Sequence, residues 1–169
     1  MSPEGDGAVH ASLRSGRSDP AIEAGLALLE IAPRITRLEN TVLGDLPQPL
    51  TFRQYRLLER VSQGQTTITA LGRLATISLP AVSESVDVLV RKGLLIRAPS
   101  ERDWRESVLA LTESGSAALS AARTALDELA ATVLVGIGSR RLAPLARDVR
   151  AVGAHVTDRL NALRMQPPE

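Results

Sequence analysis

The side chains best suited to chemistry are basic, and they gather in the middle of the chain. Residues 51–105 carry nine basic and five acidic groups, whereas residues 1–50 have a net charge of −3 and residues 106–169 are neutral. Within this middle third, the stretch from Arg91 to Arg105 holds five basic and two acidic residues. A local positive patch is what contact with phosphate requires, because each neutralised phosphate releases condensed counterions. The charge pattern fits a nucleic-acid interface and a solvated charged face equally well.

Residues suited to catalysis or metal binding are scarce. The absence of cysteine excludes disulfides, thiolate metal sites and thiol nucleophiles. His10 and His155 are the only histidines, and they lie too far apart in the sequence for a zinc site or a catalytic dyad. Paired carboxylates for hydrolysis and a phosphate-cradling glycine loop are also lacking. We therefore expect no enzymatic activity, no metal and no cofactor.

The composition predicts a mostly helical protein with an aliphatic core. Aromatic residues make up only 2% of the 169 residues, while Leu and Ala, both strong helix formers, dominate the apolar set. No apolar run approaches the roughly 20 residues that a membrane span needs, and the first residues lack a signal-peptide pattern. We expect a soluble, cytoplasmic, single-domain protein in which residues 1–19 form a flexible tail.

Helical periodicity predicts long amphipathic helices at both ends of the chain. Apolar residues recur at three- and four-residue steps from Ala21 to Leu43, with Asp19 as the cap and Pro20 at the first position. Pro33 should kink this helix or split it in two. Residues 112–134 and 139–165 form two more helices in this interpretation. The last one carries an apolar stripe from Leu142 to Leu163, which requires a helical partner.

The middle of the chain has the pattern of a helix-turn-helix. Thr51 and Gln54 form a capping box at the start of a helix that ends at Gly64. Two short helices follow, the first capped by Thr69 and the second beginning at Pro80 and ending at Gly93. In the second helix the buried stripe consists of Val82, Val86, Leu89 and Val90, which leaves Ala81, Ser83, Glu84, Ser85, Asp87 and Val88 on other faces.

After Gly93 the hydrophobic period changes to that of strands. Residues 94–99 and 106–111 alternate on either side of a charged tip at 100–105, which predicts a β-hairpin. A hairpin directly after a helix-turn-helix is a wing. The expected fold is therefore mainly α with a small β-hairpin wing: a winged helix-turn-helix plus a helical dimerisation region.

Over residues 20–165 the order of these elements resembles the MarR family of winged-helix transcriptional regulators. The resemblance extends to individual positions, which form five short motifs in the expected order. They are Leu50, Thr51, Gln54 and Leu58; Leu71 to Ala75; Val82, Ser83, Val86, Asp87, Leu89, Lys92, Gly93, Leu94 and Arg97; Asp103 and Arg105; and Leu111, Thr112 and Gly115.

The resemblance implies a homodimer that binds double-stranded DNA as a sequence-specific transcriptional regulator, expected to be a repressor. The N- and C-terminal helices would interlock and present two lobes to adjacent major grooves of a pseudo-palindromic operator. Residues 20–50 and 116–165 would then supply the dimerisation helices and residues 51–115 the DNA-binding region, all within one intertwined domain.

The resemblance carries the family's wing pair over to Asp103 and Arg105, but the recognition helix departs from the family pattern. Pro80 and Ala81 stand where small hydroxyl residues are common, and Glu84 stands where arginine or another polar donor is common. Arg105 would enter the minor groove, oriented by Asp103, although the two could also form an ordinary surface ion pair. Glu84 would accept a hydrogen bond from a cytosine amino group, or else pair with a neighbouring arginine. The expected backbone contacts are Arg91, Lys92, Arg97 and Arg102, and the expected recognition-helix contacts are Pro80, Ala81, Ser83 and Glu84.

Many members of this family bind a small phenolic or anionic effector that releases DNA. An anion site could be supplied by Arg34, Arg37, Arg53 and Arg56, which could equally be solvated. The lack of cysteine argues against peroxide sensing, and the scarcity of aromatic residues argues against a stacking pocket. Two alternatives to the regulator stay open: a winged-helix module that docks an acidic protein, and a sequence-tolerant protein that coats DNA.

Overall fold

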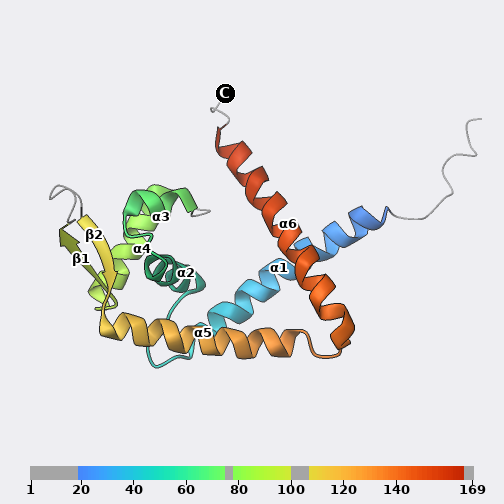
Figure 1. Ribbon diagram of the computed structural model, residues 1–169, viewed down its shortest axis with the longest axis horizontal. Helices are drawn as coiled ribbons and strands as arrows, with labels where there is room; N and C mark the ends of the chain where they lie inside the picture. The colour runs from blue at the N-terminus through green and yellow to red at the C-terminus, as the bar shows by residue number, and fades with distance from the viewer. Residues whose placement is uncertain (1–18, 75–77, 100–106, 166–169) are drawn as a thin grey trace, which may run out of the picture. The chain divides into compact units, whose positions relative to one another are not determined.

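The computed structural model describes residues 19–74, 78–99 and 107–165, and these form helices and one two-stranded hairpin (Figure 1). The mainly helical fold with a small wing is confirmed. The chain divides after Leu38 into two compact units. The elements are α1 (Pro20–Gly44), α2 (Phe52–Ser62), α3 (Ile68–Leu74), α4 (Leu79–Arg91), β1 (Leu95–Pro99), β2 (Ser107–Leu111), α5 (Glu113–Val133) and α6 (Ser139–Met165).

Helix α1 begins where its cap predicts and continues through its internal proline. The Asp19 carboxylate accepts a hydrogen bond from the backbone N–H of Ala21 at 2.9 Å. Of the two effects expected of Pro33, a kink or a split, the split is wrong, because the helix is continuous from Pro20 to Gly44. Proline has no N–H, so one backbone hydrogen bond of the helix is missing. The other backbone hydrogen bonds on either side of Pro33 keep the helix together. An ion pair between Arg34 and Glu30, 3.0 Å long, also spans the proline.

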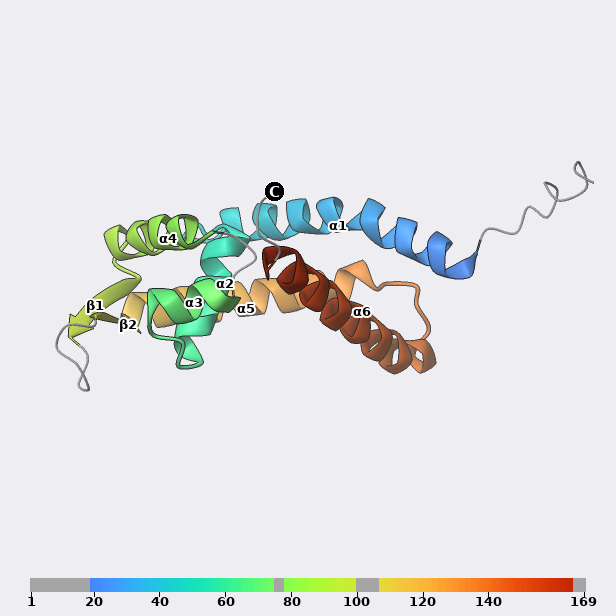
Figure 2. The same cartoon turned by 90° about the horizontal axis from the view of Figure 1, so that it is seen from above.

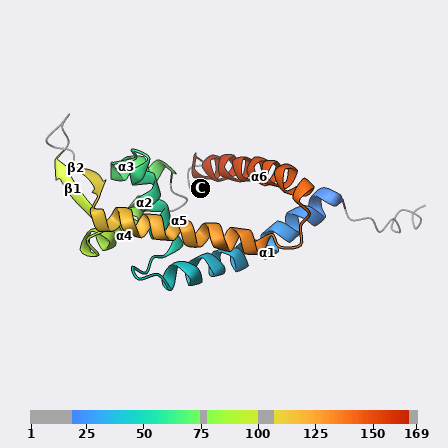
Figure 3. The same ribbon diagram turned by 60° about the horizontal axis from the view of Figure 1, so that its bottom comes forward.

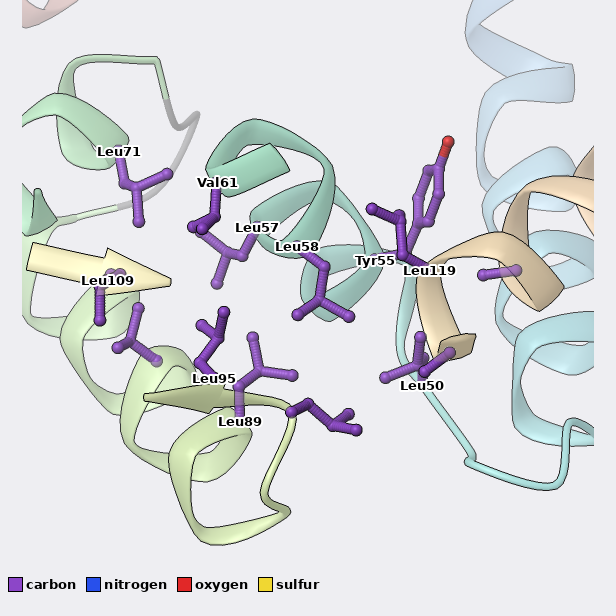
Figure 4. Close-up of a cluster of buried hydrophobic side chains, with 14 of the residues drawn as sticks. Leu50, Tyr55, Leu57, Leu58, Val61, Leu71, Leu89, Leu95, Leu109 and Leu119 are labelled. Atoms are coloured by element: carbon purple, nitrogen blue, oxygen red, sulfur yellow. The ribbon is translucent and has the colours of Figure 1, made fainter. Parts of the chain in front are cut away.

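The hydrophobic core lies among α2, α4, the hairpin and α5, and it is aliphatic as the composition predicts. Leucines from all of these elements converge in Figure 4, where Leu57, Leu58, Leu89, Leu95, Leu109 and Leu119 are each at most 2% exposed. Among the described residues Tyr55 is the one buried aromatic side chain, and its hydroxyl points out of the cluster. This core fixes the position of α4 and the wing relative to α2.

The helix-turn-helix consists of α3 and α4, with two corrections to its details. The cap of α3 is Thr67, whose hydroxyl accepts from the backbone N–H of Ala70, so the assignment of Thr69 as cap is wrong. In α4 the predicted stripe faces the core: Val82, Val86 and Leu89 are fully buried, and Val90 is partly buried against them. Ser85, which the helical period places on another face, is buried because its hydroxyl donates to the carbonyl of Ala81 at 2.8 Å.

The wing strands pair in antiparallel register, from Leu95 opposite Leu111 to Pro99 opposite Ser107. Strand β2 also forms a hydrogen bond with the segment before α3, because the N–H of Leu109 donates to the carbonyl of Thr66 at 2.7 Å. Helix α4 contacts β1, and α5 begins directly after β2, as Figures 2 and 3 show from two directions. The hairpin is therefore attached to both sides of the helix-turn-helix.

Helix α6 follows a glycine-containing turn and has the bounds that the sequence predicts. Its apolar stripe is exposed, with Val149, Val156 and Leu163 each more than half accessible. Within the part of the chain that the structure describes, no helix is long and apolar enough to cross a membrane.

Candidate nucleic-acid interface

The exposed face of α4 is polar and lies opposite its buried stripe. Pro80, Glu84 and Arg91 are exposed, and Ala81, Ser83, Asp87 and Val88 are partly accessible. The helix has Ser78 at its N-cap and Pro80 in its first turn. Ser78, Ala81 and Ser83 at this end are small, whereas Leu79, the first residue of the helix, is 49% exposed. The predicted recognition-helix residues Pro80, Ala81, Ser83 and Glu84 thus lie at or near the surface of one helical segment.

Arg97 lies on β1 and forms an ion pair with α4. Its Nη2 atom donates to Oδ1 of Asp87 at 2.5 Å, and the side chains are 37% and 47% exposed. The sequence predicts Arg97 as a phosphate contact and places Asp87 on the accessible part of α4, but it does not indicate that the two meet. Asp87 and Arg97 are ten residues apart, with a helix end and a turn between them, so no sequence periodicity predicts their contact.

Lys92, another predicted phosphate contact, is held by the segment around the start of α2. Its ammonium donates to the carbonyl of Pro49 at 2.7 Å and approaches Oε1 of Gln54 at 3.4 Å. Gln54 belongs to the predicted capping box, which is present at Thr51. Lys92 therefore joins the end of α4, the predicted recognition helix, to the N-terminus of α2. Arg91, the residue before it, is exposed.

The residues predicted at the wing tip, Arg102, Asp103 and Arg105, lie outside the described residues. The strands that lead to and from the tip are described, and they begin and end as the sequence predicts to within a residue. The minor-groove role of Arg105 stays a prediction.

The four arginines proposed for an anion site lie on two helices. Arg34 pairs with Glu30 on α1, and Arg37, one turn later, also has an interaction partner. On α2, Arg53 is exposed, and Nη1 of Arg56 lies 3.1 Å from Oε2 of Glu59. Arg34 and Arg37 belong to the first compact unit, and Arg53 and Arg56 to the second. The two arginines of α1 and the two of α2 are therefore described separately, and a shared anion site stays a prediction.

A polar network between α2 and α5 was not predicted. The carboxylate of Glu59, only 18% exposed, accepts from the Tyr55 hydroxyl at 3.0 Å and lies 3.9 Å from Nε of Arg123. Nη2 of Arg123 also donates to the Ser62 hydroxyl at 3.2 Å. The sequence periodicity of α5 predicts which face of the helix is buried. It does not predict which α2 residues Arg123 contacts.

Burial perturbs three ionisable groups in this region. Burial, followed by the hydrogen bond to Glu59, raises the pKa of Tyr55 above its usual value. Burial lowers the pKa of Arg60, and the nearby Arg56 adds to the effect. Burial also raises the pKa of Glu39 at the end of α1, although Arg56 opposes the shift. Tyr55 and Arg60 belong to α2, and Glu39 is close enough to Arg56 on that helix for its charge to act on it, which indicates a partly desolvated polar surface there.

Groups of three or more His, Cys, Asp or Glu side chains able to hold a metal ion do not occur in the described ranges.

Comparison with known proteins gives one sequence match and many similar folds. Residues 48–106 match the sequence profile described as MarR family. No curated protein matches the sequence. The transcriptional regulator BldR from Sulfolobus solfataricus has 20% identity and a TM-score of 0.68, over 80% of this chain and 95% of that one.

Two further solved structures agree. A MarR mutant from E. coli complexed with operator DNA has 24% identity and a TM-score of 0.66, over 80% of this chain and 99% of that one. A MarR family protein from Bacillus stearothermophilus has 19% identity and a TM-score of 0.69, over 83% and 99%. The matched segment contains α2, α3, α4 and β1, the elements that build the polar face described above. The winged helix-turn-helix segment therefore matches the MarR family in sequence, and the described chain shares the fold of these solved structures.

Proposed function

We propose that this protein is a sequence-specific DNA-binding repressor that acts as a homodimer on a pseudo-palindromic operator. The observation that carries the proposal is the polar, accessible face of α4 next to a hairpin wing on one rigid core. An α-helix fits the major groove of B-DNA, and side chains such as Ser83 and Glu84 can reach base edges there. The E. coli MarR mutant of similar fold is complexed with operator DNA, which supports the same partner for this chain.

A homodimer is supported by the exposed apolar faces of the terminal helices. Leu26 and Leu29 on α1 are more than 60% exposed, and the α6 stripe is exposed as well. Exposed apolar stripes of this length are typical of helices that pack against a partner. In a two-fold dimer the two recognition helices would meet half-sites about one helical turn apart.

Fluorescence anisotropy at several salt concentrations tests the proposal. The protein is titrated with a duplex from its own upstream region and with a scrambled duplex of equal length. We expect tighter binding of the upstream duplex, by at least about a thousandfold, with affinity falling as salt rises. Equal affinity for both duplexes would support a DNA-coating protein instead. Absence of DNA binding would overturn the regulator and favour a module that docks an acidic protein.

Substitution of Arg105 should distinguish sequence-specific DNA binding from non-specific attraction to DNA. Arg105→Ala is expected to weaken binding of the upstream duplex by roughly tenfold or more, because a specific arginine contact contributes about 1–3 kcal/mol. The dimer should persist in sedimentation. Arg140→Ala, which removes an equal charge at the exposed start of α6, serves as the control. Equal losses in the two variants would show that Arg105 contributes only general charge.

Release by a small phenolic or anionic effector is the last part of the proposal. All four candidate arginines are exposed, and Arg53 on α2 is the one we take for the test. Benzoate is a suitable probe, since it is both aromatic and anionic. We expect millimolar benzoate to lower the anisotropy of the complex at constant ionic strength, and Arg53→Ala to reduce this response. An equal effect of sodium chloride would show salt screening alone.

A further inference from the structure

The recognition helix carries a charge pattern that by itself opposes DNA binding. Helix α4 has two acidic residues, Glu84 and Asp87, and one basic residue, Arg91. The three are spaced by three and four residues, so they share the accessible face. Val82, Val86 and Leu89 occupy the opposite face and are fully buried. A free carboxylate at the centre of this face would repel phosphate.

The structure gives Asp87 a cationic partner from the wing. The Arg97 guanidinium donates to the Asp87 carboxylate at 2.5 Å. Side chains alternate along a strand, so Arg97 points to the same face of β1 as Leu95, which is buried in the core beside α4. Arg97 therefore extends the packed face of β1 to the rim of the recognition helix.

The place of Arg97 in the hairpin makes this contact a structural link. It pairs in register with Leu109, whose N–H donates to Thr66 before α3. The Asp87–Arg97 pair thus closes a loop of contacts that runs from α3 through α4 and back through β1 and β2. Rotation of the hairpin relative to α4 would have to break it.

We propose that Asp87 and Arg97 form a positioning pair that sets the wing relative to the recognition helix. Arg97 then acts through Asp87 and is not a phosphate contact, contrary to the sequence prediction. The pair also neutralises the carboxylate that would otherwise face DNA. This inference rests on the proposed DNA-binding function and names residues that determine its specificity.

Asp87→Asn separates this role from general electrostatics, because the two predict opposite signs. Loss of a negative charge alone should tighten binding to every duplex. A positioning role predicts tighter binding to the scrambled duplex, since Arg97 is freed, and weaker binding to the upstream duplex, since the wing is no longer set. We expect the ratio of the two affinities to fall by about two- to fivefold, the change that breaking an exposed ion pair allows.

Matched variants complete the experiment. Asp127→Asn removes an exposed carboxylate from α5 and should leave the ratio unchanged. Arg97→Gln should lower the ratio as Asp87→Asn does, and the double variant should lose no more than either single one. Arg97→Lys keeps a cation for Asp87 and should restore most of the ratio. If Arg97 contacts phosphate instead, Arg97→Gln lowers the salt slope by about one and Asp87→Asn does not weaken specific binding.

A measurement without DNA keeps the inference separate from the proposed function. Hydrogen exchange of the β1 amides should be several-fold faster in Asp87→Asn than in the wild type, while α2 amides are unchanged. If the wild type does not discriminate between the duplexes, the proposed function fails and the exchange result alone decides whether the pair holds the wing. An unchanged affinity ratio in a discriminating wild type, or unchanged exchange in a non-discriminating one, overturns the positioning pair.

Discussion

At the scale of single residues, Gly115 shows why a glycine is required in the motif after the wing. A Cβ atom at this position would lie 1.9 Å from the carbonyl oxygen of Leu94. Backbone atoms cannot move aside as the end of a flexible side chain can. We expect Gly115→Ala to lower the free energy of unfolding by about 3 kcal/mol, at the upper end of the usual cost of overpacking.

Urea denaturation measures this effect. Gly138→Ala is the matched control, because a Cβ atom there meets nothing within 4 Å and the backbone needs no positive φ. Its free energy of unfolding should stay within about 0.5 kcal/mol of the wild type. Similar losses in the two variants would show that loss of flexibility, and not the contact with Leu94, determines the cost.

Glu39 is a residue whose charge burial disfavours. Its pKa is raised in the folded protein, so the protonated form is favoured there and the charged form reduces stability above the unfolded pKa. Glu39→Gln should therefore stabilise the protein at pH 7, by a few tenths of a kcal/mol because the group is only partly buried. Below about pH 4 the wild-type carboxyl is protonated and the gain should vanish.

Thermal melts of both proteins at pH 7 and pH 4 test this sign. A stabilisation that persists at pH 4 would contradict the assignment, and a destabilisation at pH 7 would show that attraction by Arg56 exceeds the cost of burial.

Residue types were easier to predict from the sequence than residue partners. The cap of α2 by Thr51 follows from local chemistry and is confirmed. The contacts of Lys92 with Pro49 and of Arg97 with Asp87 join segments that the sequence does not bring together. Ser85 illustrates the same limit within one helix, because its hydroxyl is satisfied by the preceding turn and can be buried.

At the scale of elements, Thr112 joins the wing to α5. Its hydroxyl accepts from the N–H of Gly115 at 2.9 Å and donates to the carbonyl of Gly93 at 2.7 Å. It therefore caps α5 and also holds the turn after the recognition helix. Thr112→Val should cost about 1–2 kcal/mol of stability through the lost cap and the unsatisfied carbonyl.

Thr124→Val in the middle of α5 is the control, since that hydroxyl only donates to the preceding turn at 3.3 Å. Denaturation should show a change of less than about 0.5 kcal/mol for this variant. An equal change in both would indicate that threonine's helix propensity, and not the double contact of Thr112, determines the result.

The bounds of the elements were largely predictable, because caps, glycines and periodicity are local signals. The sequence indicates helices over residues 112–134 and 139–165, and the structure places α5 and α6 there to within a residue. The split at Pro33 was wrong because a single missing hydrogen bond does not outweigh a long amphipathic helix. The bond between Leu109 and Thr66 was missed, because one backbone pair leaves no pattern in the sequence.

At the scale of the whole molecule, both the small net charge and the exposed apolar faces of α1 and α6 favour a dimer that binds one operator. A charge of +1 provides little general attraction to DNA, so affinity must come from the wing and the recognition helix. Two lobes joined in a dimer provide two such surfaces for one operator. The proposed dimer would therefore contribute to DNA binding as well as cover the apolar stripes.

Val156→Lys tests this dependence. Val156 lies within the α6 stripe and is 53% exposed in the single chain, so a dimer that covers the stripe would bury the new charge in both copies. An unpaired buried charge costs about 3–5 kcal/mol, so the dimer should weaken by at least about a hundredfold. Affinity for the upstream duplex should fall with it.

Ala151→Lys places the same side chain about 140° away around α6, on the face opposite the stripe. Sedimentation velocity across a range of concentrations should show this variant as a dimer wherever the wild type is one, and Val156→Lys as a monomer. Circular dichroism checks that both retain their helices. A Val156→Lys protein that stays dimeric would exclude the α6 stripe as the interface, and a monomer with undiminished DNA affinity would show that one lobe suffices for operator binding.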